Sequence, residues 1–437
     1  MNTSVRRRLG VLVAAAVSVS LLAGCASGGS AGDKASVSSS SAAHPTAAAG
    51  STVPDVTVKA GFSPYGDELM GIAGVTRGYF KDVGITFDPA PNGAKVDLIG
   101  SLTPLENGQV DLGSGYLPSV ASQLDNVKNV TTFGISDVFY GYRILAPKGK
   151  YKTVSELMKS GKSYQAAVKQ VLAQMKGKEV IERTGVVPTF YNLITKRAGT
   201  TTADWKVSYL ANPDIVRAAQ SGKADFVSPT GAVEITTLLQ DGWESLIDLP
   251  TVIDNEKPAD TVSLRSTFSG YLTTTEYADA HWDTLLRFTS VMYRLIADMD
   301  EDPKAVATDY VDYLNSYTGS KLTADQLAAT FDGLYSLRNF DDATQLYDDE
   351  SDPFNVATVA GAQIKDLEDQ KVLKGDYSVD DLSIAGEIYA DLVKYKKLAD
   401  ENLAKAPDGD LKTKAQGYYD AYDFLDAYRL AAQAVKG

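Results

Sequence analysis

One short segment, which occurs twice, places the strongest constraint on the fold. Residues 106–115 read ENGQVDLGSG and residues 220–229 read QSGKADFVSP. In each copy a helical pattern ends at a glycine, which adopts the left-handed backbone conformation at little cost, and an aspartate leads into a short apolar strand. Small residues follow the strand in both copies. A chain that repeats this turn is predicted to build one α/β arrangement twice.

The hydrophobic pattern around both copies alternates between the periods of strands and helices. The first half predicts strands at 56–60, 85–87, 110–112 and 130–135, and helices at 68–80, 94–107 and 118–124. The second half predicts strands at 179–181, 206–209, 224–227 and 246–247, and helices at 189–197, 213–221 (with Asn212 as its N-cap) and 233–240. Repeated β-α-β units predict a mostly parallel sheet with flanking helices, so two series predict two similar lobes.

The N-terminal residues have the pattern of an exported lipoprotein. Residues 1–24 combine three arginines with an apolar run that is too short to span a bilayer, which is typical of a signal peptide. The run ends in Leu-Ala-Gly-Cys, which resembles the bacterial lipobox, so we expect Cys25 to be acylated and to anchor the protein at the extracytoplasmic face of the cell membrane. Cys25 is the only cysteine, so disulfides within the chain are excluded. The alternative is a plain signal peptide whose apolar region ends in cysteine.

Composition limits the other classes of function. Residues 25–53 are mostly Ala, Ser and Gly and predict a flexible tether. The formal net charge of −14 argues against nucleic acid as a partner. His281 is the only histidine outside the tether, so a zinc site built on several histidines or cysteines is excluded, and a Ser-His-Asp triad would require this residue. The acidic run at 348–352 does not have the spacing of an EF-hand loop. We expect no metal and no cofactor.

Several motifs, in order, resemble one family. Residues 78–85 (GYFKDVGI), 105–113 (LENGQVDLG), 302–306 (DPKAV) and 317–319 (YTG) are similar to the nitrate/sulfonate/taurine and thiamine-precursor group of type II periplasmic solute-binding proteins. The resemblance covers about residues 55 to 375. It implies the α/β, two-lobed fold of those proteins, binding rather than catalysis, a small organic solute held between the lobes, and an ABC permease as partner. We expect a monomer.

On this basis the chain divides into a first lobe at 54–142, a second lobe at 143–270, and a return to the first lobe at 271–437. The segment 151–176 is longer than the usual connection, and residues 381–437 add two long amphipathic stretches as extra C-terminal helices. Both additions leave the subfamily and the substrate open.

Candidate ligand-binding residues follow the predicted strand ends and the two crossings between lobes, because ligands of open α/β sheets lie outside the carboxyl ends of the strands. These are Phe62, Ser63, Tyr65, Ser114, Gly115, Tyr116, Tyr140, Thr189, Phe190, Ser228, Thr230, Ser269 and Tyr271. Each tyrosine offers a flat apolar face and one polar end, although core packing is an equally good interpretation of any single one. Asp111 and Asp225 are expected to fix the turns rather than to contact a solute.

The charge of the solute is expected to be neutral, zwitterionic or weakly anionic, because few cations fall in these loops. Arg77 and Arg143 are the nearest by sequence. Two other classes of function stay open. One is an exported hydrolase that uses paired carboxylates, and the other is a lipid-anchored interaction module without a role in transport.

Overall fold

A computed structural model describes residues 54–96, 102–183, 188–265 and 267–437, and Cys25 and the predicted tether lie outside these ranges. The first sheet contains seven strands: β1 (Val56–Phe62), β2 (Ile85–Asp88), β3 (Ala94–Lys95), β4 (Leu112–Tyr116), β5 (Val130–Phe139), β11 (Phe268–Thr274) and β12 (Tyr335–Leu337). The second contains five: β6 (Arg143–Pro147), β7 (Glu179–Arg183), β8 (Lys206–Leu210), β9 (Phe226–Ser228) and β10 (Trp243–Asp248).

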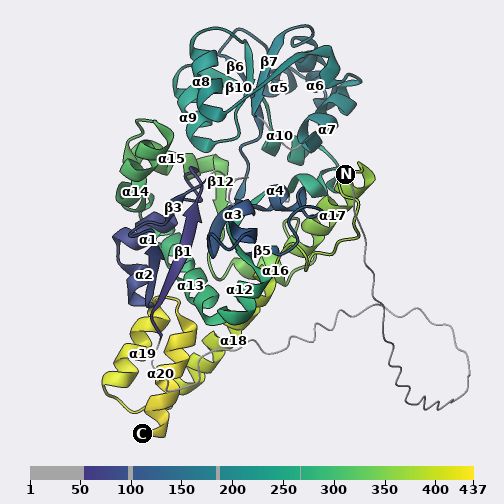
Figure 1. The fold of residues 1–437 in the computed structure, drawn as a ribbon. Coiled ribbons are helices and arrows are strands. Elements are labelled where there is room, and N and C mark those ends of the chain that lie inside the picture. The colour runs from purple at the N-terminus through teal and green to yellow at the C-terminus, as the bar shows by residue number, and fades with distance from the viewer. Residues whose placement is uncertain (1–53, 97–101, 184–187, 266) are drawn as a thin grey trace, which may run out of the picture. The chain divides into compact units, whose positions relative to one another are not determined.

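Helices accompany both sheets (Figure 1). Those in sequence with the first sheet are α1 (Gly71–Thr76), α2 (Tyr79–Asp82), α3 (Leu102–Glu106), α4 (Leu117–Ala121), α12 (Thr275–Ala280), α13 (Trp282–Glu301), α14 (Pro303–Thr318), α15 (Ala324–Leu334), α16 (Ala343–Tyr347), α17 (Val356–Asp369), α18 (Ala385–Leu403), α19 (Asp410–Asp420) and α20 (Phe424–Lys436). Those in sequence with the second are α5 (Val154–Lys159), α6 (Tyr164–Ala173), α7 (Pro188–Ala198), α8 (Asn212–Gln220), α9 (Ala232–Gln240), α10 (Leu249–Asn255) and α11 (Pro258–Thr261), with 3-10 turns at Thr202–Asp204 and Val262–Arg265. None of the helices in these described ranges has the length and apolar composition that a membrane span requires.

Both sheets share one strand order. The first runs β2-β1-β4-β11-β5, with β12 beyond β5, and the second runs β8-β7-β9-β6-β10. In each, three strands are parallel and the fourth runs against its two neighbours. That reversed strand, β11 or β6, is in each case the first strand after the chain has crossed from the other sheet. The prediction of two similar, mostly parallel α/β arrangements is therefore confirmed, although the reversed strand was not predicted.

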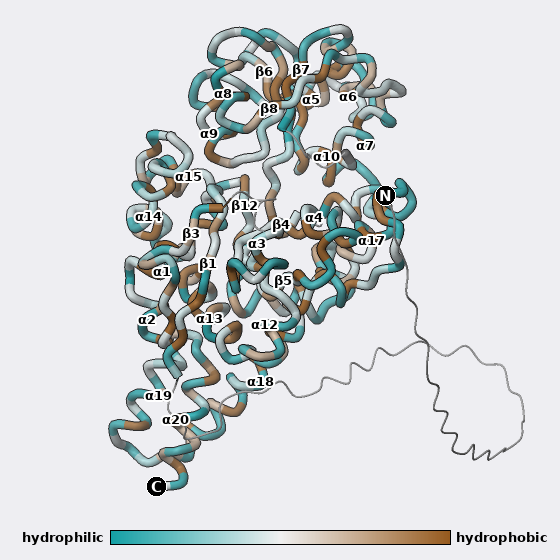
Figure 2. Tube along the Cα trace, viewed as in Figure 1, coloured by the Kyte–Doolittle hydropathy of each residue, from teal (hydrophilic) through white to brown (hydrophobic). Residues whose placement is uncertain are grey.

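The long helix α13 forms the centre of the largest apolar core. Phe288 on this helix lies between the rings of Phe80, Phe133 and Tyr271, at centroid distances of 5.1, 5.5 and 4.9 Å. Hydrophobic residues run through the strands of both sheets, whereas hydrophilic residues predominate in the outer turns (Figure 2). Through Phe288, α13 packs against Phe133 of β5 and Tyr271 of β11, so this face of the first sheet is buried.

Three sequence-based elements were wrong in detail. Residues 94–107 are not one helix, because the described part contains the short strand β3 and the short helix α3 instead. The helix predicted at 68–80 is divided into α1 and α2 at Gly78, which has a φ of +78°. Asn212 is not an N-cap but the first residue of α8, and its Oδ1 atom accepts a hydrogen bond from the backbone N–H of Thr230 at 3.1 Å.

The C-terminal segment forms three helices, not two, and they pack onto the first sheet's core. Buried residues of α18 and α20 join the same apolar cluster as α13. A buried ion pair reinforces this contact, because Asp426 on α20 accepts hydrogen bonds from Arg287 on α13 at 2.9 Å and from Arg429 at 2.6 Å. All three side chains are at most 1% exposed. The extension is thus an integral part of this half of the protein.

We predict that Asp426→Asn destabilises the protein strongly. The substitution leaves Arg287 and Arg429 buried without their counter-charge, which costs about 3–5 kcal/mol in comparable sites. Urea unfolding at neutral pH measures this loss. Asp82→Asn is the control, because it removes the exposed partner of Arg294 and should cost less than about 1 kcal/mol. Equal stability of the two variants would show that the buried pair does not hold α20 in place.

Candidate functional site

The carboxyl ends of β1 and β4 come together through one buried hydrogen-bond chain. The backbone N–H of Ser63, just after β1, donates to Ser114 Oγ at 2.8 Å. Ser114 Oγ in turn donates to Glu68 Oε2 at 2.7 Å. Two predicted site residues are therefore adjacent, and the hydroxyl group of Ser114 is bonded to the carboxylate of Glu68, which the sequence had indicated only as the start of a helix.

Two more buried carboxylates lie beside this chain. Asp67 precedes Glu68, and Asp137 comes from β5, where Ser136 Oγ donates to its Oδ2 at 2.8 Å. Burial raises the pKa of Asp67, and burial together with the negative charge of Asp67 raises the pKa of Asp137 well above its usual value. We call Asp67, Glu68 and Asp137 the acidic cluster. Carboxyl groups in such a setting either hold a proton or face a positive charge.

The register of β11 brings further predicted residues to the acidic cluster. Ser269 lies opposite Tyr116 on one side and opposite Asp137 on the other, and Tyr271 lies opposite Ser114. Residues directly opposite in antiparallel strands share one face of the sheet. Close packing allows this register, because a Cβ on Gly115 would lie only 2.3 Å from Leu272. The predicted small-residue loop at 113–115 is therefore strand, not loop.

A pair of tyrosines links the first sheet to the first crossing. The hydroxyl groups of Tyr116 and Tyr142 are hydrogen-bonded at 2.7 Å, and both side chains are buried. Burial and the neighbouring Tyr142 raise the pKa of Tyr116. The ring of Tyr142 also stacks with Phe190 of α7 at a centroid distance of 6.3 Å. Aromatic contacts thus run from β4 through the crossing into the second lobe.

The second sheet contributes a similar group at the carboxyl ends of β7 and β9. Ser228 Oγ donates to the carbonyl oxygen of Arg143 at 2.6 Å and accepts a hydrogen bond from Tyr191. Thr230 is held by Asn212, as described above. Glu182, near the end of β7, has a pKa raised to about 7 by burial, and its Oε1 atom has no hydrogen-bond partner within the described residues.

Other predicted residues serve the apolar cores or the surface. Phe62 is buried against Phe87 at 5.6 Å, and Phe190 lies in the core of the second lobe. Tyr140 packs edge-to-face on Phe354 at 5.7 Å, so its ring is directed toward the C-terminal part of the first lobe. Tyr65 and Thr189 are half-buried.

The two arginines nearest by sequence are engaged elsewhere. Arg77 forms ion pairs with Asp298 and Asp309. The guanidinium of Arg143 donates to the carbonyl oxygen of Gly141 at 3.0 Å. Neither arginine is therefore directed to the acidic cluster by its own hydrogen bonds.

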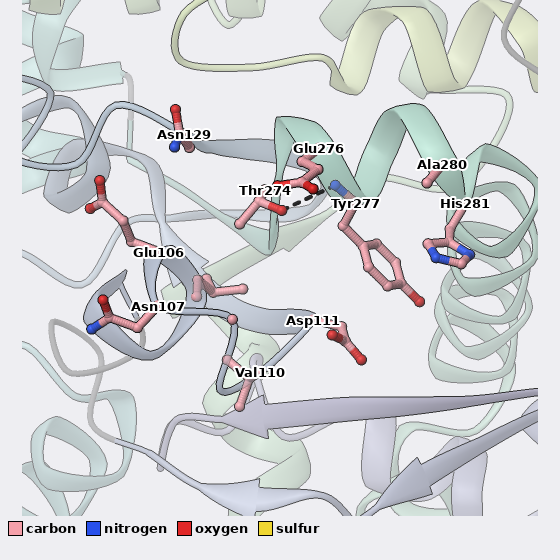
Figure 3. A pocket seen from close by; sticks show the side chains of 12 residues that line it. Glu106, Asn107, Val110, Asp111, Asn129, Thr274, Glu276, Tyr277, Ala280 and His281 are labelled. Carbon is pink, nitrogen blue, oxygen red and sulfur yellow. Dashed lines mark hydrogen bonds between the residues drawn. The ribbon is translucent and has the colours of Figure 1, made fainter.

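Asp111 and Asp225 fix their turns, as predicted. Asp111 Oδ2 accepts from the backbone N–H of Lys59 at 2.9 Å, and Asp225 accepts from Lys150 and from Tyr151 Oη at 2.7 Å. Asp111 also lines a separate pocket of about 450 Å³ at the amino end of β4. There Tyr277 and His281 lie side by side, with ring centroids 4.3 Å apart (Figure 3). This pocket is at the opposite end of the parallel strands from the acidic cluster.

Sequence reasoning missed all three members of the acidic cluster. A usable signal was present for Asp137, because it is the single charged residue in the apolar segment VTTFGISDVF. A charge in a fully buried strand is rare unless it is paired or functional. For Asp67 and Glu68 the helical pattern of the following residues suggested an ordinary helix start, and only the fold shows that they are buried.

Comparison with known proteins gives similarity of structure but not of sequence. No protein-family model matches the chain, and no curated protein matches its sequence. The ligand-binding component of an ABC-type import system from Staphylococcus aureus, with zinc bound, is similar with a TM-score of 0.51 at 13% identity, over 76% of this chain and 98% of that chain. The periplasmic aliphatic sulphonate binding protein SsuA from Escherichia coli has a TM-score of 0.48 at 18% identity, over 74% and 91%. A mutant of DSZB in complex with biphenyl-2-sulfinic acid has a TM-score of 0.48 at 10% identity, over 78% and 100%.

At 13% identity the similarity to the import-system component from Staphylococcus aureus is one of fold. The chain therefore has a two-sheet α/β fold similar to that of this component, extended by C-terminal helices.

Proposed function

We propose that this protein is an extracytoplasmic, lipid-anchored solute-binding protein that captures a small organic solute between two lobes and delivers it to an ABC importer. The observation that carries the proposal is the repeated strand order, with buried polar side chains at the carboxyl ends of both sheets: Ser63, Ser114 and Asp137 in the first, Glu182 and Ser228 in the second. Ligands of open α/β sheets bind at these ends. The lipobox-like sequence before Cys25 and the tether after it support the location.

The first crossing between the sheets is short, which is consistent with movement of the two lobes about it. Only residues 140–142 separate β5 from β6, and within them Tyr142 contacts both Tyr116 and Phe190. A few residues between two packed bodies are a common form of hinge. Closure around a solute would then bury the solute and present a distinct form to a permease.

A second candidate function, hydrolysis by paired carboxylates, has one observation in its favour. Asp67 and Asp137 are close enough for the charge of one to raise the pKa of the other, which is how a general acid is kept protonated near neutral pH. Turnover of chromogenic glycosides by the purified protein, with Asp137→Asn as the inactive variant, would favour the hydrolase. Binding without turnover would favour the receptor.

Solute binding should stabilise the native protein. We predict that a fraction of a bacterial small-molecule extract raises the melting temperature, because a ligand present at about 100 times its Kd adds about 2.7 kcal/mol to the free energy of unfolding. Differential scanning fluorimetry measures the shift. Tyr142→Phe should reduce it, since the variant lacks the hydroxyl bond to Tyr116. A full set of extract fractions that leaves the melting temperature of the folded protein unchanged would argue against a receptor.

Lipidation gives an independent prediction about location. In the full-length protein expressed in bacteria, Cys25 should carry acyl chains at the mature N-terminus, and Cys25→Ser should release the protein into the soluble extracytoplasmic fraction. Intact-mass spectrometry and membrane fractionation measure the two outcomes. An unmodified Cys25 in a membrane-free protein would contradict the anchor but would leave solute binding unaffected.

A further inference from the structure

We propose that the solute has a net positive charge, carried by an ammonium group that binds against Asp67 and Asp137 in the first lobe. This inference rests on the solute-binding function proposed above and specifies the chemistry of its ligand. This ligand differs from the neutral, zwitterionic or weakly anionic solute that the sequence suggested. The reason is that the fold, and not the sequence, shows Asp67 and Asp137 to be buried close to the candidate site.

The burial of the acidic cluster is nearly complete. Asp67 is 3% exposed, Glu68 is 2% exposed and Asp137 is 0% exposed. Asp67 Oδ1 and Asp137 Oδ1 have no hydrogen-bond partner in the part of the chain that the structure describes. A buried carboxylate oxygen left unpaired costs free energy, so its retention is typical of a functional site. Both oxygens can accept from the N–H groups of an ammonium ion.

Two neutral groups beside the acids point to the same position. Tyr271 Oη and Ser63 Oγ are also buried and have no hydrogen-bond partner among the described residues. Tyr271 lies opposite Ser114 in the sheet, and Ser63 donates its backbone N–H to that same serine. Ser63 and Asp67 follow β1, Tyr271 lies on β11, and Asp137 lies on β5. These four unpaired oxygens, which come from three elements, form a set of acceptors that suits a ligand with several N–H donors.

The charges near the acidic cluster are unbalanced. No ion pair to Asp67 or Asp137 is formed by the residues that the structure describes, and Arg77 and Arg143 are bound elsewhere. The buried carboxylate of Asp426 shows the contrast, because this chain surrounds it with two arginines. At Asp426 the chain thus neutralises a buried acid with its own cations. At the strand ends, the described residues supply no positive charge to Asp67 and Asp137, so we assign that charge to the solute.

Tyrosines surround the same carboxylates. The charges of Asp67 and Asp137 contribute to raising the pKa of Tyr116, Tyr271, Tyr310 and Tyr335, after burial as the main cause. Tyr310 is held in place by its hydrogen bond to the carbonyl oxygen of Gly66 at 2.7 Å. Aromatic faces attract organic cations through the ring quadrupole. A sulfonate in this position would meet two carboxylates and no described cation.

An organic ammonium fits this site better than a metal ion. Within the described ranges, no group of three or more His, Cys, Asp or Glu side chains has the arrangement that could hold a metal. The surroundings are aromatic and apolar, whereas Mg²⁺ and Ca²⁺ require six or more oxygen ligands, several of them usually waters. Treating the probe with a chelating resin separates the two cases.

The experiment uses a bacterial small-molecule extract that has been treated with a chelating resin and divided by ion exchange into cationic, neutral and anionic fractions. The cationic fraction should raise the melting temperature of the purified protein by about 5 °C or more. The double variant Asp67→Asn/Asp137→Asn should lose at least about nine-tenths of this shift. Asp82→Asn, which removes an exposed acid from the same half of the protein, should retain it.

The unliganded double variant separates a binding role from a structural one. In the double variant, amides of the same shape replace two buried acids and remove their mutual repulsion. The melting temperature of the unliganded variant should therefore equal or exceed that of the wild type. Circular dichroism confirms that it is folded. If the double variant does not fold, the release of protons when the ligand binds to the wild-type protein tests the binding role instead. Calorimetry of the purified cationic component in phosphate and in Tris should show protons released on binding, since a bound cation favours the ionised carboxylates.

Three results would overturn the proposal: a shift from the neutral or anionic fraction alone, an undiminished shift in the folded double variant, or a shift caused by Mg²⁺, Ca²⁺ or Zn²⁺ salts in place of the fraction. An unchanged melting temperature with every fraction would instead contradict solute binding itself. The failure of the ammonium inference is therefore distinguishable from the failure of the proposed function.

Discussion

The insertion of β11 between β4 and β5 is the constraint on which the first lobe depends. Three backbones approach so closely that a Cβ on Gly270 would lie 2.0 Å from the carbonyl oxygen of Gly134. This approach sets the register that places Ser269 opposite Asp137. It also brings the chain back to the first sheet after the second lobe is complete. The architecture and the candidate site therefore arise from the same strand.

The sequence predicted the architecture well because its signals were local. The turns at Gly108 and Gly222 and the alternation of periods were enough to indicate two similar α/β lobes, and both glycines have positive φ values. The reversed strands β6 and β11 were beyond such reasoning, because strand direction depends on pairing between residues far apart in the chain. For the same reason, the strand predicted at 110–112 lies instead at Leu112–Tyr116, where it pairs with β11.

Prediction of the site was less complete, and the reason is physical. Ser63, Ser114 and Ser269 were correctly expected near the strand ends, and the structure gathers them around Glu68 and Asp137. The sequence shows which residues are polar, but their burial and their hydrogen-bond partners depend on tertiary contacts. An aspartate in a loop is ordinarily solvated, so nothing in the local sequence shows that Asp67 is buried. For this reason the acidic cluster was not among the residues that the sequence predicted for the site.

Buried charge is treated differently at the C-terminal helices and at the acidic cluster. A buried carboxylate is tolerated when cations or hydrogen bonds compensate for its lost hydration, as Arg287 and Arg429 do for Asp426. Asp67 receives hydroxyl and backbone N–H groups and Asp137 receives hydroxyl groups, but no described cation pairs with either, and their raised pKa values express the remaining cost. That cost lowers the stability of the unliganded state and so increases the difference that a cationic ligand makes. Tyr116 lies near the acidic cluster and is hydrogen-bonded to Tyr142 at the crossing. A ligand that neutralises these carboxylates would therefore bind directly beside the connection between the two sheets.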